Sequence, residues 1–237
     1  MSKENLETYL DHQTRKVKDN VEIVDVKTTK HPVLLHMSKD SKIKEFVPFV
    51  SGRTMKTEDR TVPRVSTSTH VYGCFYGYAG AIFDFIDGPT NINDPGFDGG
   101  WYFYSMDYKL ALKPNKELVP DVEMSSEVWL VPYKDSNQYS ANIIARVIPV
   151  SVVTEWKFHK NVRYQTNFYT MQIEVTSREI MLTEDISVKK GYWEFIMETN
   201  RDYIKERVFN VNKISKSDFN KNKKEKTTME TLRSLTW

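Results

Sequence analysis

Apolar and polar positions alternate along much of the chain with the period of two residues that is typical of β-strands. The predicted strands cover residues 21–26, 31–38, 63–70, 101–112 (one long strand or a strand pair), 127–132, 141–153, 164–175 and 191–197. Most of them are rich in Val, Ile, Tyr and Phe, which favour a pleated sheet. Pro149 predicts a bulge or an edge within its strand, because proline donates no backbone hydrogen bond. The pattern therefore predicts a protein built mainly from sheet.

Helical patterns are few. Residues 1–20 are charged with widely spaced apolar positions, and they predict a short helix followed by an edge strand. Small and aromatic residues over 72–86 predict a tightly packed helix. The polar stretch 39–63 predicts a long connection, and connections of this length often act as lids or binding loops.

These elements predict three segments along the chain. Residues 1–30 form an N-terminal helix and edge strand, 31–156 form the core, and 157–237 form a C-terminal β/α extension with a basic tail. Residues 201–237 hold ten Lys and Arg against five Asp and Glu, whereas the whole chain carries a net charge of only +2. Such a tail is usually solvated. The alternative interpretation is that residues 213–237 contact the phosphates of a nucleic acid.

Cys74 is the single cysteine among 237 residues, which excludes an intramolecular disulfide and predicts a reducing compartment. The N-terminal residues lack the apolar core of a signal peptide, and no run approaches the roughly 18 apolar residues that span a bilayer. We therefore expect a cytoplasmic protein without membrane contact. The Lys-, Asn- and Tyr-rich composition also fits a viral protein, whose compartment would be the host cytoplasm.

Several common chemistries lack their sequence patterns. The five histidines show neither His-x-x-x-His nor His-x-His spacing, so no metal site is predicted. The chain has no Gly-x-Ser-x-Gly nucleophile elbow, and its glycine-rich stretch matches neither a Walker motif nor a dinucleotide fingerprint. Ordinary hydrolases and nucleotide-binding domains are therefore not expected.

Three predicted strands carry polar residues in a recognisable order. His36 ends an apolar strand together with Ser38, Ser66-Thr67-Ser68 precedes the aromatic, glycine-containing helix, and Glu127 opens a late strand. This order resembles the ADP-ribosyltransferase superfamily over about residues 33–153. In that superfamily a first-strand His or Arg, a second-strand Ser/Thr or Tyr position and a late-strand Glu bind NAD. The resemblance implies an α+β fold with a split, mostly antiparallel sheet and flanking helices.

The resemblance also implies that NAD is the substrate and that ADP-ribose is transferred to a macromolecular acceptor. Glu127 is the implied catalytic residue, because a carboxylate beside the ribose stabilises the positive charge that develops when the bond to nicotinamide breaks. Tyrosines of the helix would stack on the nicotinamide ring. Arg64, or else Arg53 or Arg60, would neutralise the pyrophosphate. The residues implied to bind the cofactor are His36, Ser38, Arg64, Ser66, Thr67, Ser68, Tyr72 and Tyr76.

Two departures leave the acceptor open between a protein and a nucleic acid. Members with a first-strand His usually carry a Tyr on the second strand, whereas this chain has Ser-Thr-Ser. Ser125-Ser126-Glu127 also replaces the Glu-x-Glu or Gln-x-Glu of many protein-modifying members. A second interpretation is a catalytically inactive interaction protein with the same fold, for instance a virus-encoded inhibitor or assembly component that binds a host protein. His36, the Ser-Thr-Ser run and Glu127 would then be ordinary structural residues.

Overall fold

The structure is a computed structural model, and it describes residues 3–29, 33–50, 52, 57–77, 100–132, 138–159, 162–200 and 207–221. The chain forms two compact units. Unit 1 comprises Met1–Ala79, Phe103–Ile143 and Ile180–Ser187, and unit 2 comprises Gly80–Tyr102, Ile144–Glu179 and Val188–Trp237. Each unit draws on three separate stretches because strand pairing joins distant parts of the sequence. The units therefore do not coincide with the segments 1–30, 31–156 and 157–237.

The sheet of unit 1 has the strand order β1-β6-β7-β4-β2-β5. The β1–β6, β6–β7, β7–β4 and β4–β2 pairings are antiparallel. β1 stands at the end of this order, which confirms the predicted edge strand. The strands are β1 (Val21–Asp25), β2 (Leu34–Ser38), β4 (Val65–Ser68), β5 (Trp101–Met106, of which 101–102 belong to unit 2), β6 (Leu110–Pro114) and β7 (Glu127–Leu130).

Two parts of the long polar connection pair with the strands around it. β3 (Glu45–Phe46) pairs with the first residues of β8 (Tyr139–His159), and Phe49 forms an isolated bridge with Arg64. A separate two-stranded sheet joins β10 (Ile180–Thr183) and β11 (Ile186–Val188). The connection therefore reaches the strand that carries the Ser-Thr-Ser run.

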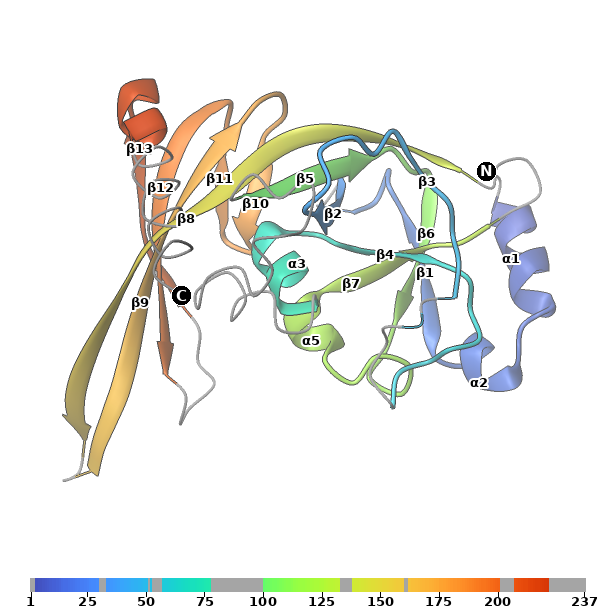
Figure 1. Ribbon diagram of the computed structural model, residues 1–237. Coiled ribbons are helices and arrows are strands. Elements are labelled where there is room, and N and C mark those ends of the chain that lie inside the picture. Colours follow the sequence, from blue (N-terminus) through green and yellow to red (C-terminus); the bar gives the residue numbers. More distant parts are fainter. Residues whose placement is uncertain are drawn as a thin grey trace, which may run out of the picture. The chain divides into compact units, whose positions relative to one another are not determined.

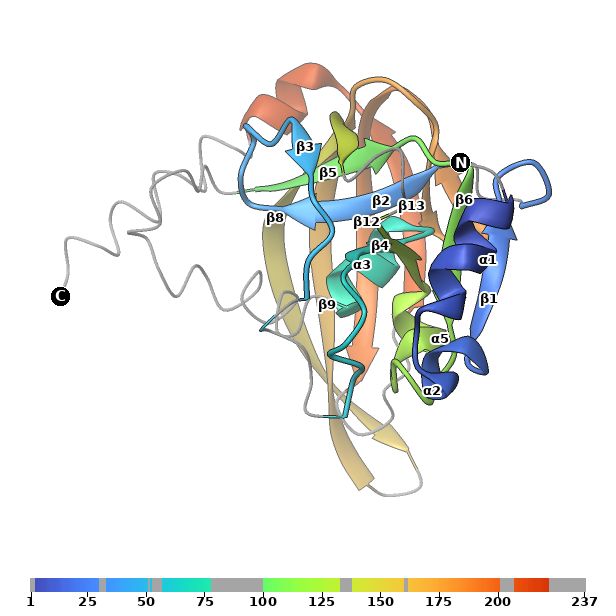
Figure 2. The same ribbon diagram turned by 90° about the vertical axis from the view of Figure 1, so that its right-hand side faces the viewer.

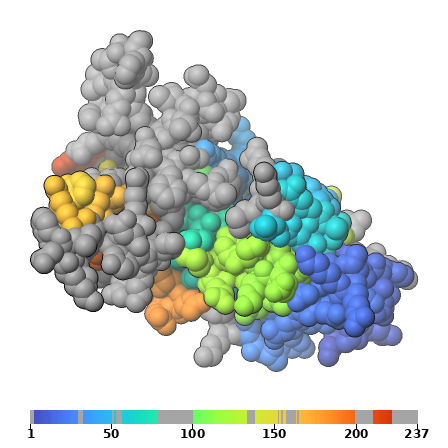
Figure 3. Space-filling model, turned by 90° about the horizontal axis from the view of Figure 1, so that it is seen from below, coloured from blue at the N-terminus to red at the C-terminus, as the bar shows by residue number. Residues whose placement is uncertain are grey.

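Short helices cover one face of the unit 1 sheet. The N-terminal residues form two helices, α1 (Lys3–Asp11) and α2 (Arg15–Lys18), where the sequence predicts one, because the Thr14 side chain caps a new helix start. Both helices lie beside β1 and β6 (Figures 1 and 2). α5 (Val122–Ser125) lies at the surface next to the blue N-terminal residues (Figure 3). These helices close a core that includes Leu6, Val17, Leu112, Val122 and Trp129.

The described part of the second predicted helix is α3 (Val71–Gly77). α3 packs against α5, β2 and β4, and the remainder of the predicted 72–86 helix lies outside the described residues. Val71, Gly73, Cys74 and Phe75 are its buried residues. α3 therefore faces the strands that carry the predicted site.

Unit 2 contains the antiparallel series β8-β9-β12-β13, in which β8 and β9 form a long ribbon (Figure 1). The strands that follow β8 are β9 (Val162–Val175), β12 (Gly191–Asn200) and β13 (Arg207–Ile214). The β8–β9 register shifts between Pro149 and Ser151, which confirms the predicted bulge. After β13 a helical turn at 216–221 buries Phe219, whose ring lies 5.1 Å from that of Tyr192. Residues 222–237 of the basic tail lie outside the described residues.

The architecture agrees with the predicted α+β class: antiparallel sheet dominates and the helices are few. Among the described residues, no helix combines the length and the apolar character needed to cross a bilayer.

Candidate functional site

Strand pairing in unit 1 brings the predicted site segments together. Ser68 of β4 stands opposite Glu127 of β7, and Leu35 of β2 stands opposite Ser68. Directly opposed residues of an antiparallel pair project to the same face of a sheet. The second-strand serine and the late-strand glutamate therefore share one face, the face on which α3 packs.

A cavity of about 140 Å³ lies where β2, β4 and β7 meet α3 and the end of α5. Five of the nine residues implied by the resemblance line it, whereas Ser38, Arg64, Tyr72 and Tyr76 do not. The lining residues are Leu35, His36, Met37, Ser66, Thr67, Ser68, Gly73, Cys74, Gly77, Ser125 and Glu127.

Glu127 enters the cavity from the first position of β7. Ser126 precedes it in the left-handed conformation, with φ of 47°, and this conformation ends α5 and turns the chain into the strand. The Glu127 carboxylate is almost fully buried, and its Oε1 accepts a hydrogen bond of 2.7 Å from Trp129 Nε1. Burial raises the pKa of Glu127, although hydrogen bonds from Ser66 and Trp129 and the charge of Arg64 oppose the rise.

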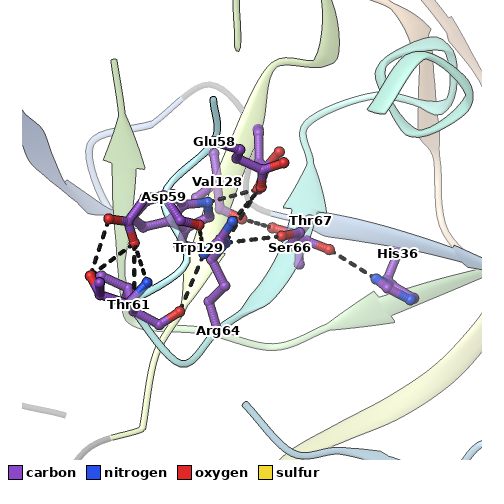
Figure 4. Close-up of polar contacts among 11 residues, drawn as sticks. His36, Glu58, Asp59, Thr61, Arg64, Ser66, Thr67, Val128 and Trp129 are labelled. Atoms are coloured by element: carbon purple, nitrogen blue, oxygen red, sulfur yellow. Dashed lines mark hydrogen bonds and ion pairs between the residues drawn. The ribbon is translucent and has the colours of Figure 1, made fainter. Parts of the chain in front are cut away.

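Arg64 is buried and does not line the cavity, and its guanidinium group lies among Glu58, Asp59 and Ser66 (Figure 4). Nη1 donates to Asp59 O at 3.0 Å, Nη2 forms an ion pair with Glu58, and Nε lies 3.8 Å from Glu127 Oε1. Its donors are thus directed into the protein, and this geometry does not place Arg64 to contact a pyrophosphate. Of the alternatives, Arg60 is exposed and Arg53 lies outside the described residues.

The hydroxyl groups of the Ser-Thr-Ser run have different surroundings. Thr67 Oγ1 donates to Val128 O at 2.6 Å, and Ser68 Oγ donates to Ser125 O at 2.8 Å. Ser66 is exposed, and its Oγ accepts a hydrogen bond from Arg64 Nε at 3.4 Å. Thr67 and Ser68 therefore build the cavity wall, while Ser66 is the member of the run that solvent reaches.

His36 lies in the wall formed by β2, with its ring against Phe46 at 4.5 Å between centroids. Its Nδ1 lies 2.8 Å from Ser66 O (Figure 4). A carbonyl oxygen only accepts, so Nδ1 carries the hydrogen. Burial lowers the pKa of His36, which favours the neutral ring and leaves Nε2 as an acceptor. Ser38 is the last residue of β2, and its hydroxyl accepts a hydrogen bond from the Asp40 amide at 3.1 Å instead of facing the cavity.

The face of α3 that meets the cavity is made of small residues. Gly73, Cys74 and Gly77 line the cavity, whereas Tyr72 and Tyr76 lie one turn apart on another face, with ring centroids 6.1 Å apart. The expected stacking of these tyrosines on a ligand in the cavity is therefore not supported, because helical periodicity turns them away from the residues that line it.

Gly73 is a candidate that the sequence reasoning missed, whereas Cys74 entered it only as the single cysteine of the chain. A Cβ atom at position 73 would lie 2.2 Å from Ser68 Oγ and 2.4 Å from Ser125 O, so the close approach of α3 requires glycine. Burial raises the pKa of the Cys74 thiol, which keeps it protonated and unsuited to nucleophilic attack. The spacing of small residues at 73, 74 and 77 was the available clue in the sequence.

Within the described ranges, no group of three His, Cys, Asp or Glu side chains is arranged to hold a metal ion. A scan against protein-family models finds no match, and searches of curated proteins and of solved structures find none either. The chemistry of the cavity therefore has to be argued from its own residues.

Proposed function

We propose that this chain binds NAD through the cavity around Glu127 and transfers ADP-ribose from it to a protein or nucleic-acid acceptor. The observation that carries the proposal is the convergence of three segments far apart in the sequence. His36, the Ser-Thr-Ser run and Glu127 were selected for their resemblance to ADP-ribosyltransferases, and all of them line one cavity.

The size of the cavity suits the reactive end of NAD. A volume of about 140 Å³ is close to that of an engineered cavity that admits benzene. The nicotinamide ring has the same six-membered form, whereas the rest of the dinucleotide is much larger. We therefore infer that nicotinamide enters the cavity and that the adenosine part lies outside it.

The charges beside the cavity suit a cationic ligand. When they are ionised, Glu58, Arg64 and Glu127 sum to −1 + 1 − 1 = −1. The nicotinamide ring of NAD is a pyridinium cation, and cleavage of its bond to ribose leaves positive charge on the sugar. A buried carboxylate stabilises that charge more strongly than an exposed one, because little water screens it.

The direct test measures nicotinamide release from NAD by the full chain, with and without candidate acceptors. Glu127→Gln should reduce the rate by about 100-fold or more, because it removes the stabilising charge while preserving the shape of the side chain. Glu123→Gln is the matched control, since Glu123 is exposed on α5 and should leave the rate unchanged. Equal rates for wild type and Glu127→Gln would remove the proposal, as would no NAD turnover with any acceptor.

A non-catalytic interaction protein is the second candidate, and exposed apolar side chains favour it. Phe49, Val47 and Val50 are 63%, 50% and 43% exposed in the connection between β3 and β4. Such a cluster is typical of a surface that binds another protein. A thermal-shift titration separates the two candidates: NAD should stabilise an enzyme by RT ln(1 + [L]/Kd) and should leave a pure interaction protein unmoved.

A further inference from the structure

The guanidinium group of Arg64 lies between two carboxylates. Nη2 is ion-paired with Glu58, and Nε lies 3.8 Å from Glu127 Oε1. The Arg64 side chain is 1% exposed, and those of Glu58 and Glu127 are 12% and 11% exposed. Because little solvent reaches the three groups, each one affects the ionisation of the others more than a surface ion pair would.

Further contacts fix Arg64 in one place. Nη1 donates to the backbone oxygens of Asp59 and Val62 at 3.0 and 3.3 Å, and the guanidinium lies 4.4 Å from the centroid of the Trp129 ring. Trp129 is itself fully buried and donates from Nε1 to Glu127 Oε1. Arg64 and Trp129 therefore contact each other, and both are directed at the same carboxylate oxygen.

We propose that Arg64, braced by Glu58 and Trp129, is a positioning residue that holds Glu127 Oε1 and so directs Oε2 toward a ligand in the cavity. The role of Arg64 in catalysis rests on the proposed function. Its effect on the position and ionisation of the Glu127 carboxylate does not depend on that function. Arg64 is buried away from the cavity lining, so it acts through Glu127 and does not touch the ligand itself.

The other titratable groups around Glu127 differ in their effects. His36 from β2 is held neutral by burial, and Cys74 from α3 keeps its proton. The charged neighbours are Arg64, which favours the ionised carboxylate, and Glu58, which disfavours it. Arg64→Met and Glu58→Gln break the same ion pair, yet they should move the pKa of Glu127 in opposite directions.

The test follows the Glu127 carboxyl carbon by NMR during a pH titration of the full chain labelled with ¹³C-glutamate, with Glu127→Gln to assign the signal. We expect Arg64→Met to raise the pKa of Glu127 and Glu58→Gln to lower it. Trp129→Phe should also raise it, because the variant loses the indole donor but keeps a ring beneath Arg64. Arg15→Met is the control: it breaks an ion pair with Asp19 whose side chains are 94% and 62% exposed, and it should leave the Glu127 titration unmoved.

A Glu127 titration that is unchanged in these variants, or that moves in the same direction in Arg64→Met and Glu58→Gln, would overturn the inference and leave Arg64 with a purely structural role. If Arg64→Met does not fold, Glu58→Gln and Trp129→Phe replace it in the test. The inference then requires that these two variants move the pKa of Glu127 in opposite directions. If the pKa of Glu127 moves in opposite directions in Arg64→Met and Glu58→Gln but the protein does not turn over NAD, the positioning role is supported and the proposed function is rejected. With turnover, the acid limb of the pH–rate profile should move with the same signs.

Discussion

Ser68 and Glu127 stand directly opposite each other on the antiparallel strands β4 and β7, and both line the cavity. A one-residue slip in this pairing would turn one of the two side chains to the other face of the sheet. The register is held by Trp129, which is fully buried in the core beneath α1 and α2. The geometry of the candidate site therefore depends on the packing of the whole unit.

The stability of the protein should depend on pH through Glu127. Burial raises the pKa of Glu127 in the folded protein, so the stability linked to this group is complete below the unfolded pKa and is lost as pH rises through the folded one. Glu127→Gln resembles the protonated side chain at every pH. Its free energy of unfolding, relative to wild type, should therefore increase as pH rises from the ordinary pKa of a glutamate through the raised pKa of Glu127 in the folded protein. Urea unfolding measures this difference, and a value that stays constant or decreases with pH would contradict the assignment.

Cys74 should react with thiol reagents only when the protein opens. Its side chain is buried between α3 and β2, with Sγ 3.5 Å from Leu35 O, and burial raises the pKa of the thiol. Because the thiolate is the reactive form, the native protein should react far more slowly with iodoacetamide than the urea-unfolded protein. Mass spectrometry of the single cysteine gives both rates. Similar rates in the two states would show that α3 does not shield this position.

Much of the fold was predictable because its strands follow the period of two. The edge strand at 21–26, the bulge at Pro149 and the start of a strand at Glu127 were all predicted from local sequence. The strand order was not, because pairing such as β1 with β6 depends on contacts far apart in the chain. The N-terminal helix was predicted as one element, although Thr14 caps a second one.

The sequence predicted which residues belong to the candidate site better than it predicted the role of each residue. Motif order selected Ser66, Ser68 and Glu127, and they do line one cavity. The orientation of Arg64 and Tyr72 could not be read from the sequence, because an arginine that binds phosphate and one that is buried against Trp129 and Glu58 look alike there. Side-chain direction follows from tertiary packing, which local patterns do not encode.

Leu6→Ala should destabilise unit 1 strongly. Leu6 is fully buried in the core that joins α1 to Trp129 and Leu112. Removal of a buried leucine side chain leaves a cavity and costs about 2–5 kcal/mol. Urea unfolding should show this loss, whereas Val47→Ala, at a side chain that is 50% exposed, should change stability little. If Leu6→Ala and Val47→Ala lowered the free energy of unfolding equally, α1 would not pack against the sheet as described.

Gly73→Ala tests whether α3 must approach β4 closely to form the cavity. The added Cβ would lie 2.2 Å from Ser68 Oγ and 2.4 Å from the backbone oxygen of Ser125, so the helix has to shift. Overpacking of this kind costs about 1–3 kcal/mol, which exceeds the gain of up to about 1 kcal/mol from replacing glycine with a better helix former. We expect Gly73→Ala to lower the free energy of urea unfolding and to weaken any ligand that binds the cavity. Gly52→Ala is the matched control, because no atom of the described residues lies within 4 Å of the Cβ it would add. If Gly73→Ala were as stable as wild type and bound ligand equally well, the close contact between α3 and β4 could not be what shapes the site.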